Sequence, residues 1–162
     1  MRVAIIMGST SDLGKVEPAV EILKSYGVSV DVRCLSAHRA HLGLSAFIKE
    51  TETNGTEAII AAAGMAAALP GVVASQTVIP VIGVPLTSAT LDGMDALLSI
   101  VQMPTGFPVA TVAIYGTKNA AYLALQMMAM KHDCIREQLC AYRKQMEIDA
   151  LKANEEMIEK FK

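Results

Sequence analysis

Short apolar runs alternate along the chain with segments in which apolar residues recur every three or four positions. The runs are rich in β-branched and small residues and are bounded by Gly, Pro or polar residues, which is typical of buried strands. They predict strands at residues 2–7, 58–63, 80–84 and 109–114, and the alternation of apolar and polar residues at 28–33 predicts a further strand. The segments between them predict helices at residues 13–26, 40–53, 66–77, 93–102 and 119–130, and a long charged helix follows from residue 131.

Strand and helix alternate five times, which predicts an α/β domain of the flavodoxin-like or Rossmann-like type. We expect three layers, with a five-stranded parallel sheet between helices on both faces. The 162 residues suit a single domain. Within it, residues 1–130 form the α/β core and residues 131–162 a long C-terminal helix. Ligands of such sheets bind beyond the carboxyl ends of the strands, so the loops that follow the strands are the candidate sites.

Charge is distributed very unevenly along the chain. Between residues 58 and 117 only Asp92 and Asp95 are charged, whereas residues 131–162 hold 14 of the 30 charged residues. A domain of this size has too much surface to hide such a charge-poor region inside one monomer. We therefore expect a homo-oligomer, with the C-terminal helix packing on neighbouring subunits. The alternative is a monomer with an Ala-rich, weakly apolar surface.

Composition excludes several classes of protein. The formal net charge of −2 argues against a nucleic-acid partner. Three Cys residues form no disulfide framework and indicate a reducing compartment, which we take as the cytoplasm. The apolar run at residues 3–7 is too short for a secretory signal. The uncharged stretch at 58–91 is cut by Pro70, Pro80 and Pro85, so it predicts no membrane span and no membrane partner.

The loop after the first predicted strand reads Gly8-Ser9-Thr10-Ser11-Asp12 and leads directly into a helix. Hydroxyl groups and free backbone N–H groups at a helix N-terminus suit a phosphate. It has neither the Walker A ending nor the dinucleotide-binding glycine pattern. The alternative is ordinary helix capping, with Asp12 as the N-cap residue. Asp12 is also suited to binding sugar hydroxyls, and these roles stay open at this point.

The loop after the second predicted strand, at residues 34–41, holds two of the chain's three His residues. His38 is placed to give and take a proton near neutral pH, and Arg39 to clamp a phosphate or carboxylate. A metal site built from Cys34, His38 and His41 is the alternative, but no zinc-type spacing supports it and we predict no metal. We expect His41 to be solvated in a first helical turn. His132, between two charged residues, is expected on the surface.

Five motifs in this order resemble the PurE family of purine-biosynthesis enzymes, which act on derivatives of 5-aminoimidazole ribonucleotide. They are GSTSD at 8–12, SAHR at 36–39, AGMAAALPG at 63–71, PVIGVP at 80–85 and LLSIVQMP at 97–104. The resemblance spans about residues 2–130. It implies a flavodoxin-like subunit in a homo-octamer, with sites between subunits and no cofactor.

The resemblance also implies roles for individual residues. His38 would be the general acid and base, and Gly64, Ala66, Ala67 and Leu69 would line the carboxylate and imidazole. The phosphate and ribose of the substrate would be held by Ser9, Ser11, Asp12, Ser36 and Arg39. An aminoimidazole ring is electron-rich, so its carboxylation needs a dry pocket and a proton shuttle rather than a cofactor.

Two branches of the PurE family catalyse related reactions. The mutase branch moves a carboxylate from the exocyclic nitrogen of N5-carboxyaminoimidazole ribonucleotide to ring carbon 4. The other branch joins free carbon dioxide to aminoimidazole ribonucleotide and carries Lys beside the active His. Arg39 stands at that place here, so the resemblance favours the mutase and leaves the carboxylase as the alternative.

The chain departs from the mutase pattern at two places. The third loop usually reads Ala-Ala-His-Leu-Pro-Gly, but Ala68 stands where that His would be, and Ala40-His41 replaces a Thr-Pro pair. The third-loop His is dispensable, or His41 compensates for it, or the activity has changed; we favour the first. A non-catalytic nucleotide-binding protein is therefore a further alternative. An FMN carrier is disfavoured, because aromatic residues make up only 4% of the chain.

Overall fold

The computed structural model describes residues 1–88 and 90–162. Five parallel strands form one sheet in the order β2-β1-β3-β4-β5, which confirms the predicted flavodoxin-like topology. The strands are β1 (Arg2–Met7), β2 (Ser29–Cys34), β3 (Thr56–Gly64), β4 (Val81–Leu86) and β5 (Ala110–Thr111). The helices are α1 (Leu13–Ser25), α2 (His41–Thr51), α3 (Leu69–Ala74), α4 (Met94–Val101), α5 (Thr117–Met128) and α6 (Asp133–Lys160), and 3-10 turns occupy η1 (Thr10–Asp12) and η2 (Leu91–Gly93).

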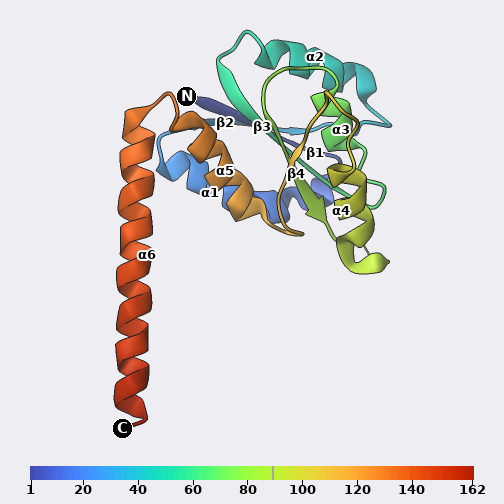
Figure 1. Cartoon of the computed structure of the whole chain (residues 1–162). Helices are drawn as coiled ribbons and strands as arrows, with labels where there is room; N and C mark the ends of the chain where they lie inside the picture. The colour runs from blue at the N-terminus through green and yellow to red at the C-terminus, as the bar shows by residue number, and fades with distance from the viewer. Residues whose placement is uncertain (89) are drawn as a thin grey trace.

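Helices cover both faces of the sheet, as Figure 1 shows. Successive side chains of β1 point to opposite faces, as the pleat of a strand requires. Val3 and Ile5 pack with α1 and α5, whereas Ala4 and Ile6 pack with α2, α3 and α4. Both sets are fully buried, so the strand is apolar on both sides. This is why the strands could be recognised in the sequence as continuous apolar runs.

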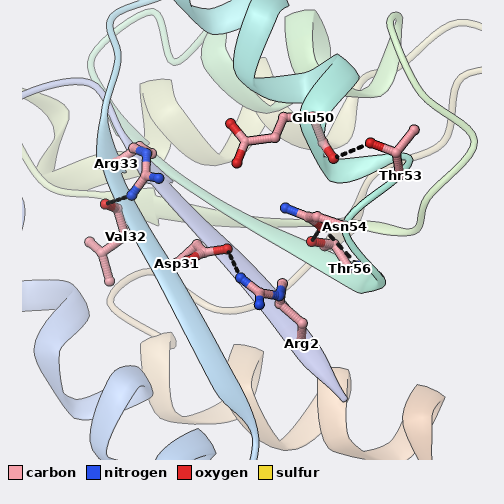
Figure 2. A network of polar contacts seen from close by, with 8 residues as sticks. All are labelled: Arg2, Asp31, Val32, Arg33, Glu50, Thr53, Asn54 and Thr56. Atoms are coloured by element: carbon pink, nitrogen blue, oxygen red, sulfur yellow. Dashed lines mark hydrogen bonds and ion pairs between the residues drawn. The ribbon is translucent and has the colours of Figure 1, made fainter.

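Polar contacts at the β2 edge of the sheet are drawn in Figure 2. Arg2 Nη1 donates to Asp31 Oδ2 at 2.6 Å, which links β1 to the edge strand β2. After α2, the side chain of Asn54 accepts from Thr56 Oγ1 at 2.6 Å and from the Thr56 N–H at 3.1 Å. This local turn ends the helical segment and directs the chain into β3.

Two elements differ from the sequence-based prediction. The helix expected at 66–77 is only Leu69–Ala74, because Met65 (φ 56°) and Ala67 (φ 25°) adopt left-handed conformations that a helix excludes. The strand expected at 109–114 is only Ala110–Thr111. The chain bulges away from β4 after Val112 and reaches it again at Tyr115, whose N–H donates to Pro85 O at 3.0 Å.

The long C-terminal helix α6 confirms its prediction and extends away from the body of the domain (Figure 1). Only Ile135 and Leu139 of its 28 residues are buried. The Tyr142 ring stacks on Tyr122 of α5, with ring centroids 5.1 Å apart. Burial, together with the neighbouring Tyr142, raises the pKa of the Tyr122 phenol above its usual range. The base of α6 is therefore docked on the core, while the rest is exposed.

The prediction that His132 lies on the surface is met only in part, because its side chain is 23% exposed. His132 is half-buried where α5 meets α6, and its Nε2 lies 2.7 Å from Glu57 Oε2 in β3. The charged neighbours in sequence predicted a solvated side chain, but the partly buried carboxylate of Glu57, in a strand far away along the chain, faces the ring. In the described part of the chain, no helix is long and apolar enough to cross a membrane.

Gly83 lies in the middle of β4, where α4 and the segment before β5 approach the sheet closely. A methyl group there would lie 2.8 Å from Val109 Cγ1 and closer still to Ile100 Cγ2. We expect Gly83→Ala to lower the free energy of unfolding by about 1–3 kcal/mol, because a packed core cannot take the added volume without strain. Urea denaturation measures the change.

Gly14→Ala is the matched control for this variant. Gly14 lies in α1 with open space around an added methyl group, so the same substitution should stabilise the protein by about 0.5–1 kcal/mol. Equal stability of Gly83→Ala and the unmodified chain would contradict the close approach of α4 to β4.

Candidate active site

A cavity of about 740 Å³ opens at the carboxyl ends of β1, β2, β3 and β4. This is the edge of a parallel sheet where ligands bind, and β1 is the strand at which the strand order reverses. The ten residues that the sequence analysis singled out all line the cavity. They are Ser9, Ser11, Asp12, Ser36, His38, Arg39, Gly64, Ala66, Ala67 and Leu69.

The loop after β1 supplies hydroxyl groups to the cavity. Ser9 Oγ accepts from the Ser11 N–H at 3.3 Å and lies 2.9 Å from Ser11 Oγ, which orders the turn η1. Asp12 occupies the N-cap position of α1, as predicted, but its side chain makes no capping hydrogen bond. Its Oδ1 instead accepts from Lys15 Nζ at 3.0 Å. The Asp12 carboxylate therefore does not bind the N–H groups at the start of α1, and it can contact a ligand in the cavity.

The loop after β2 brings His38 and Arg39 to the same cavity. Ser36 Oγ accepts from the Arg39 N–H at 3.3 Å, which closes the turn that carries His38. The Arg39 guanidinium reaches across and donates from Nη2 to Gly8 O at 3.2 Å. His38 and Arg39 are both exposed, so an incoming anion can contact them. Arg39 thus joins the two polar loops at one end of the cavity.

The loop after β3 forms a wall of small side chains. A Cβ atom at Gly64 would lie 3.1 Å from Leu86 O, so glycine lets β3 and β4 stay close at their ends. Met65 and Ala67 follow in left-handed conformations, which cost energy for residues other than glycine and concentrate at functional sites. Ala67 and Leu69 are buried. The wall leaves room for a flat ring.

Sequence reasoning missed three polar residues that line the cavity: Lys15, Thr87 and Ser88. Thr87 and Ser88 follow β4, so the rule about strand ends would have found them had it been applied to the fourth loop. Lys15 follows Asp12 by three positions on a helix, a spacing at which opposite charges meet. Met65 also lines the cavity, and its exposure was not predicted from its apolar side chain.

The three residues of the alternative metal site do not converge. His41 begins α2 and lies outside the lining of the cavity, and Cys34 is an exposed end residue of β2. Within residues 1–88 and 90–162, no group of three or more His, Cys, Asp or Glu side chains is arranged to hold a metal ion. The polar groups that line the cavity are hydroxyl, imidazole, guanidinium, ammonium and carboxylate groups.

Sheet order and cavity together define a doubly wound α/β protein with a polar cavity at its switch point. Comparison with known proteins is more specific: the model of the AIR carboxylase family matches residues 2–149, and the chain belongs to that family. The predicted PurE resemblance is thereby confirmed.

The relatives include proteins named as the mutase and a protein named as the carboxylase. The chain is 53% identical to the N5-carboxyaminoimidazole ribonucleotide mutase of Pyrococcus horikoshii, over 89% of this chain and 81% of that one. It is 50% identical to the mutase of Saccharolobus solfataricus, over 93% and 95% of the two chains. The chloroplastic phosphoribosylaminoimidazole carboxylase of Vigna aconitifolia is 43% identical over 94% of this chain and 27% of its own length. The crystal structure of Treponema denticola PurE is similar, with a TM-score of 0.85 and 28% identity over 93% of this chain and 94% of that one.

Proposed function

We propose that this chain is a purine-biosynthesis mutase that isomerises N5-carboxyaminoimidazole ribonucleotide to 4-carboxy-5-aminoimidazole ribonucleotide. The observation that carries the proposal is the convergence of His38, Arg39 and the small-residue wall from Gly64 to Leu69 on one cavity. That cavity offers a proton carrier, an anion clamp and a flat surface for a ring. The relatives named as this mutase, at up to 53% identity, support the same reaction.

The ends of the substrate are assigned by charge. A phosphate suits Arg39 and the hydroxyls of Ser9, Ser11 and Ser36, where the N-terminus of a helix also favours an anion. Asp12 repels a phosphate, so we assign it to the ribose hydroxyls, which donate hydrogen bonds to a carboxylate. The ring and its carboxylate then lie along Gly64, Ala66, Ala67 and Leu69.

The reaction needs one bond broken, one bond formed and one proton moved. The bond between the exocyclic nitrogen and the carboxyl carbon breaks, and the nitrogen keeps the electron pair and takes a proton. Ring carbon 4 then attacks the released carbon dioxide and loses its own proton. His38 gives the first proton and accepts the second, so the enzyme returns to its starting state. No electrons enter or leave, and we propose that no cofactor takes part.

Ala68 stands where the mutase pattern has His, and it lines the cavity beside Leu69. His41 lies outside that lining, which favours a site that works without a second imidazole over one in which His41 compensates. We propose that His38 alone carries the proton. The side chain at position 68 then tunes the shape of the pocket and is not required for turnover.

The test is an absorbance assay with N5-carboxyaminoimidazole ribonucleotide and no added bicarbonate. We expect conversion by the unmodified chain, because the carbon dioxide released in the pocket is the one recaptured. An absolute need for bicarbonate with aminoimidazole ribonucleotide would instead establish the carboxylase that uses free carbon dioxide, the reaction suggested by the name of the Vigna relative. Nucleotide binding without any turnover would establish a non-catalytic binding protein.

We further propose that the chain assembles into a homo-oligomer, an octamer by its PurE resemblance, in the cytoplasm. Apolar side chains of α4 and its surroundings are exposed in the single subunit, among them Met94, Leu98 and Val101 at 48%, 51% and 49%. They recur along one face of the helix and are about half exposed, so we infer that a second copy of the chain covers them. Three exposed free Cys residues support a reducing compartment.

A further inference from the structure

Lys15 is a cation at the cavity that the mutase chemistry does not use. It lies in the first turn of α1, and its side chain contacts groups from two different loops. Its Nζ donates to Asp12 Oδ1 at 3.0 Å and lies 5.8 Å from the centre of the Tyr115 ring. The ammonium group therefore has both an anionic and an aromatic partner, each of which attracts a cation.

Tyr115 is held in place from several sides. Its backbone is left-handed (φ 59°), a conformation that a bulky residue keeps only when its surroundings enforce it. Its N–H donates to Pro85 O at 3.0 Å, and its hydroxyl hydrogen-bonds to Thr87 Oγ1, on a residue that lines the cavity. The next residue, Gly116, permits the tight turn, since a Cβ atom there would lie 2.7 Å from Ala113 O. The ring is thus a fixed platform beside the cavity.

The negative charge of Asp12 is paired with the positive charge of Lys15. The side chain of Asp12 is 14% exposed and that of Lys15 is 31% exposed, so the pair lies in a partly screened setting. Asp12 is the one acidic residue among the described residues that line the cavity. Without a partner, its carboxylate would rotate freely and repel an anionic nucleotide. With Oδ1 engaged by Lys15, the other oxygen, Oδ2, has a defined position.

We propose that Lys15 is a positioning residue, which holds the Asp12 carboxylate through Oδ1 so that Oδ2 accepts from the ribose 2′-hydroxyl, with Tyr115 as its support. This inference rests on the proposed function, because that function supplies the ribose. The inference adds Lys15 to the binding residues. It also gives the Asp12–Lys15 pair a role in specificity, because the pair would distinguish a ribonucleotide from a 2′-deoxyribonucleotide.

The experiment compares the binding of 5-aminoimidazole ribonucleotide and its 2′-deoxy analogue by calorimetry. In the unmodified chain, loss of a hydrogen bond to a charged group should weaken binding about tenfold or more. In Lys15→Met that penalty should fall to about threefold or less, because a mobile carboxylate gives the hydroxyl a poorer hydrogen bond. Lys15→Arg should restore the penalty. Lys24→Met, an exposed change on the same helix, should leave it unchanged.

The penalty is a ratio of two affinities for one variant, so a smaller folded fraction cancels from it. Tyr115→Leu keeps Lys15 but removes its aromatic support, and it should lower the penalty to a value between those of the unmodified chain and Lys15→Met. In turnover, Lys15→Met should raise KM about tenfold and change kcat less than about threefold, since its contribution is to binding.

An unchanged 2′-deoxy penalty in Lys15→Met would overturn the inference, even if both ligands bound more weakly, because Lys15 would then act through net charge alone. Mutase turnover with no 2′-deoxy penalty in the unmodified chain would overturn the inference and leave the proposed function intact. A penalty that depends on Lys15 in a chain without turnover would overturn the mutase and support the inference. Failure to bind either ligand would overturn both.

Discussion

His38→Asn should lower kcat by about 100- to 10,000-fold and leave nucleotide binding nearly unchanged. The amide has a similar size and can still donate and accept hydrogen bonds, but it cannot take up and release a proton near neutral pH. The proposed reaction requires a proton both given and accepted, so its loss affects chemistry rather than affinity. Steady-state kinetics with N5-carboxyaminoimidazole ribonucleotide, together with calorimetric binding of aminoimidazole ribonucleotide, separate the two effects.

His41→Asn is the matched control for this result. It makes the same chemical change three positions along the chain, at the start of α2 and outside the lining of the cavity. We expect turnover within about twofold of the unmodified chain, as for a surface substitution that touches no substrate. A large loss in His41→Asn would show that this residue compensates for the absent His at position 68. An unchanged kcat in His38→Asn would contradict its role as general acid and base.

Ending the chain after Arg143 should convert the proposed oligomer into smaller species. This removes residues 144–162, all of which are exposed, and it keeps Ile135 and Leu139 in the core. The deleted part carries Met146, Met157 and Phe161, which are 53%, 54% and 77% exposed. Full burial of one such side chain contributes about 1.5–3 kcal/mol, so several of them buried between subunits would stabilise an assembly strongly.

These side chains continue a stripe that begins in the core. Ile135, Leu139, Tyr142, Met146 and Met157 lie within one sector of α6 at the spacing of a helix, and Phe161 follows directly after the helix ends. The first two pack on the domain and Tyr142 stacks on Tyr122, which indicates that the exposed remainder of the stripe faces a further partner. We propose that this partner is a neighbouring subunit.

Light scattering of the full and shortened chains measures the assembly. The double variant Met146→Glu with Phe161→Glu should reproduce the effect of truncation, because it places charges on the stripe. Lys152→Glu is its control, since Lys152 lies outside the stripe and should leave the size unchanged. Equal oligomer sizes in all four proteins would contradict a role for α6 in assembly, and circular dichroism verifies that each core remains folded.

Much of the fold could be read from the sequence because the sheet is buried on both faces. Strands such as β1 and β3 are continuous apolar runs, and parallel strands need helices between them, so pattern and connection length agree. Of the two elements that were misjudged, the helix expected at 66–77 and the strand expected at 109–114, only the first lines the cavity. The 65–68 turn and the bulge before Tyr115 contain residues other than glycine in left-handed conformations. No local sequence pattern predicts such conformations.

The sequence by itself determined the polar loops and their chemistry. Ser9, Ser11, Ser36, His38 and Arg39 follow the first two strands, and the topology of a parallel sheet places such loops at one edge. Their membership of a single cavity was therefore predictable before any coordinates. The same rule applies to Thr87 and Ser88, but residues 87–90, which follow the fourth strand, include no charged or aromatic side chain that indicates a binding site.

Only the tertiary structure decided which partners these groups have. Asp12 was expected to cap a helix or to bind sugar hydroxyls, and its carboxylate pairs with Lys15, whose ammonium lies beside a tyrosine 100 positions away in the chain. His132 was expected on the surface, and its partly exposed ring meets Glu57 of β3. Periodicity reports whether a residue faces the core, because burial repeats with the helix or strand. It does not predict contacts between segments far apart in sequence. These contacts form because the packing of helices on the sheet places the ends of distant elements next to each other.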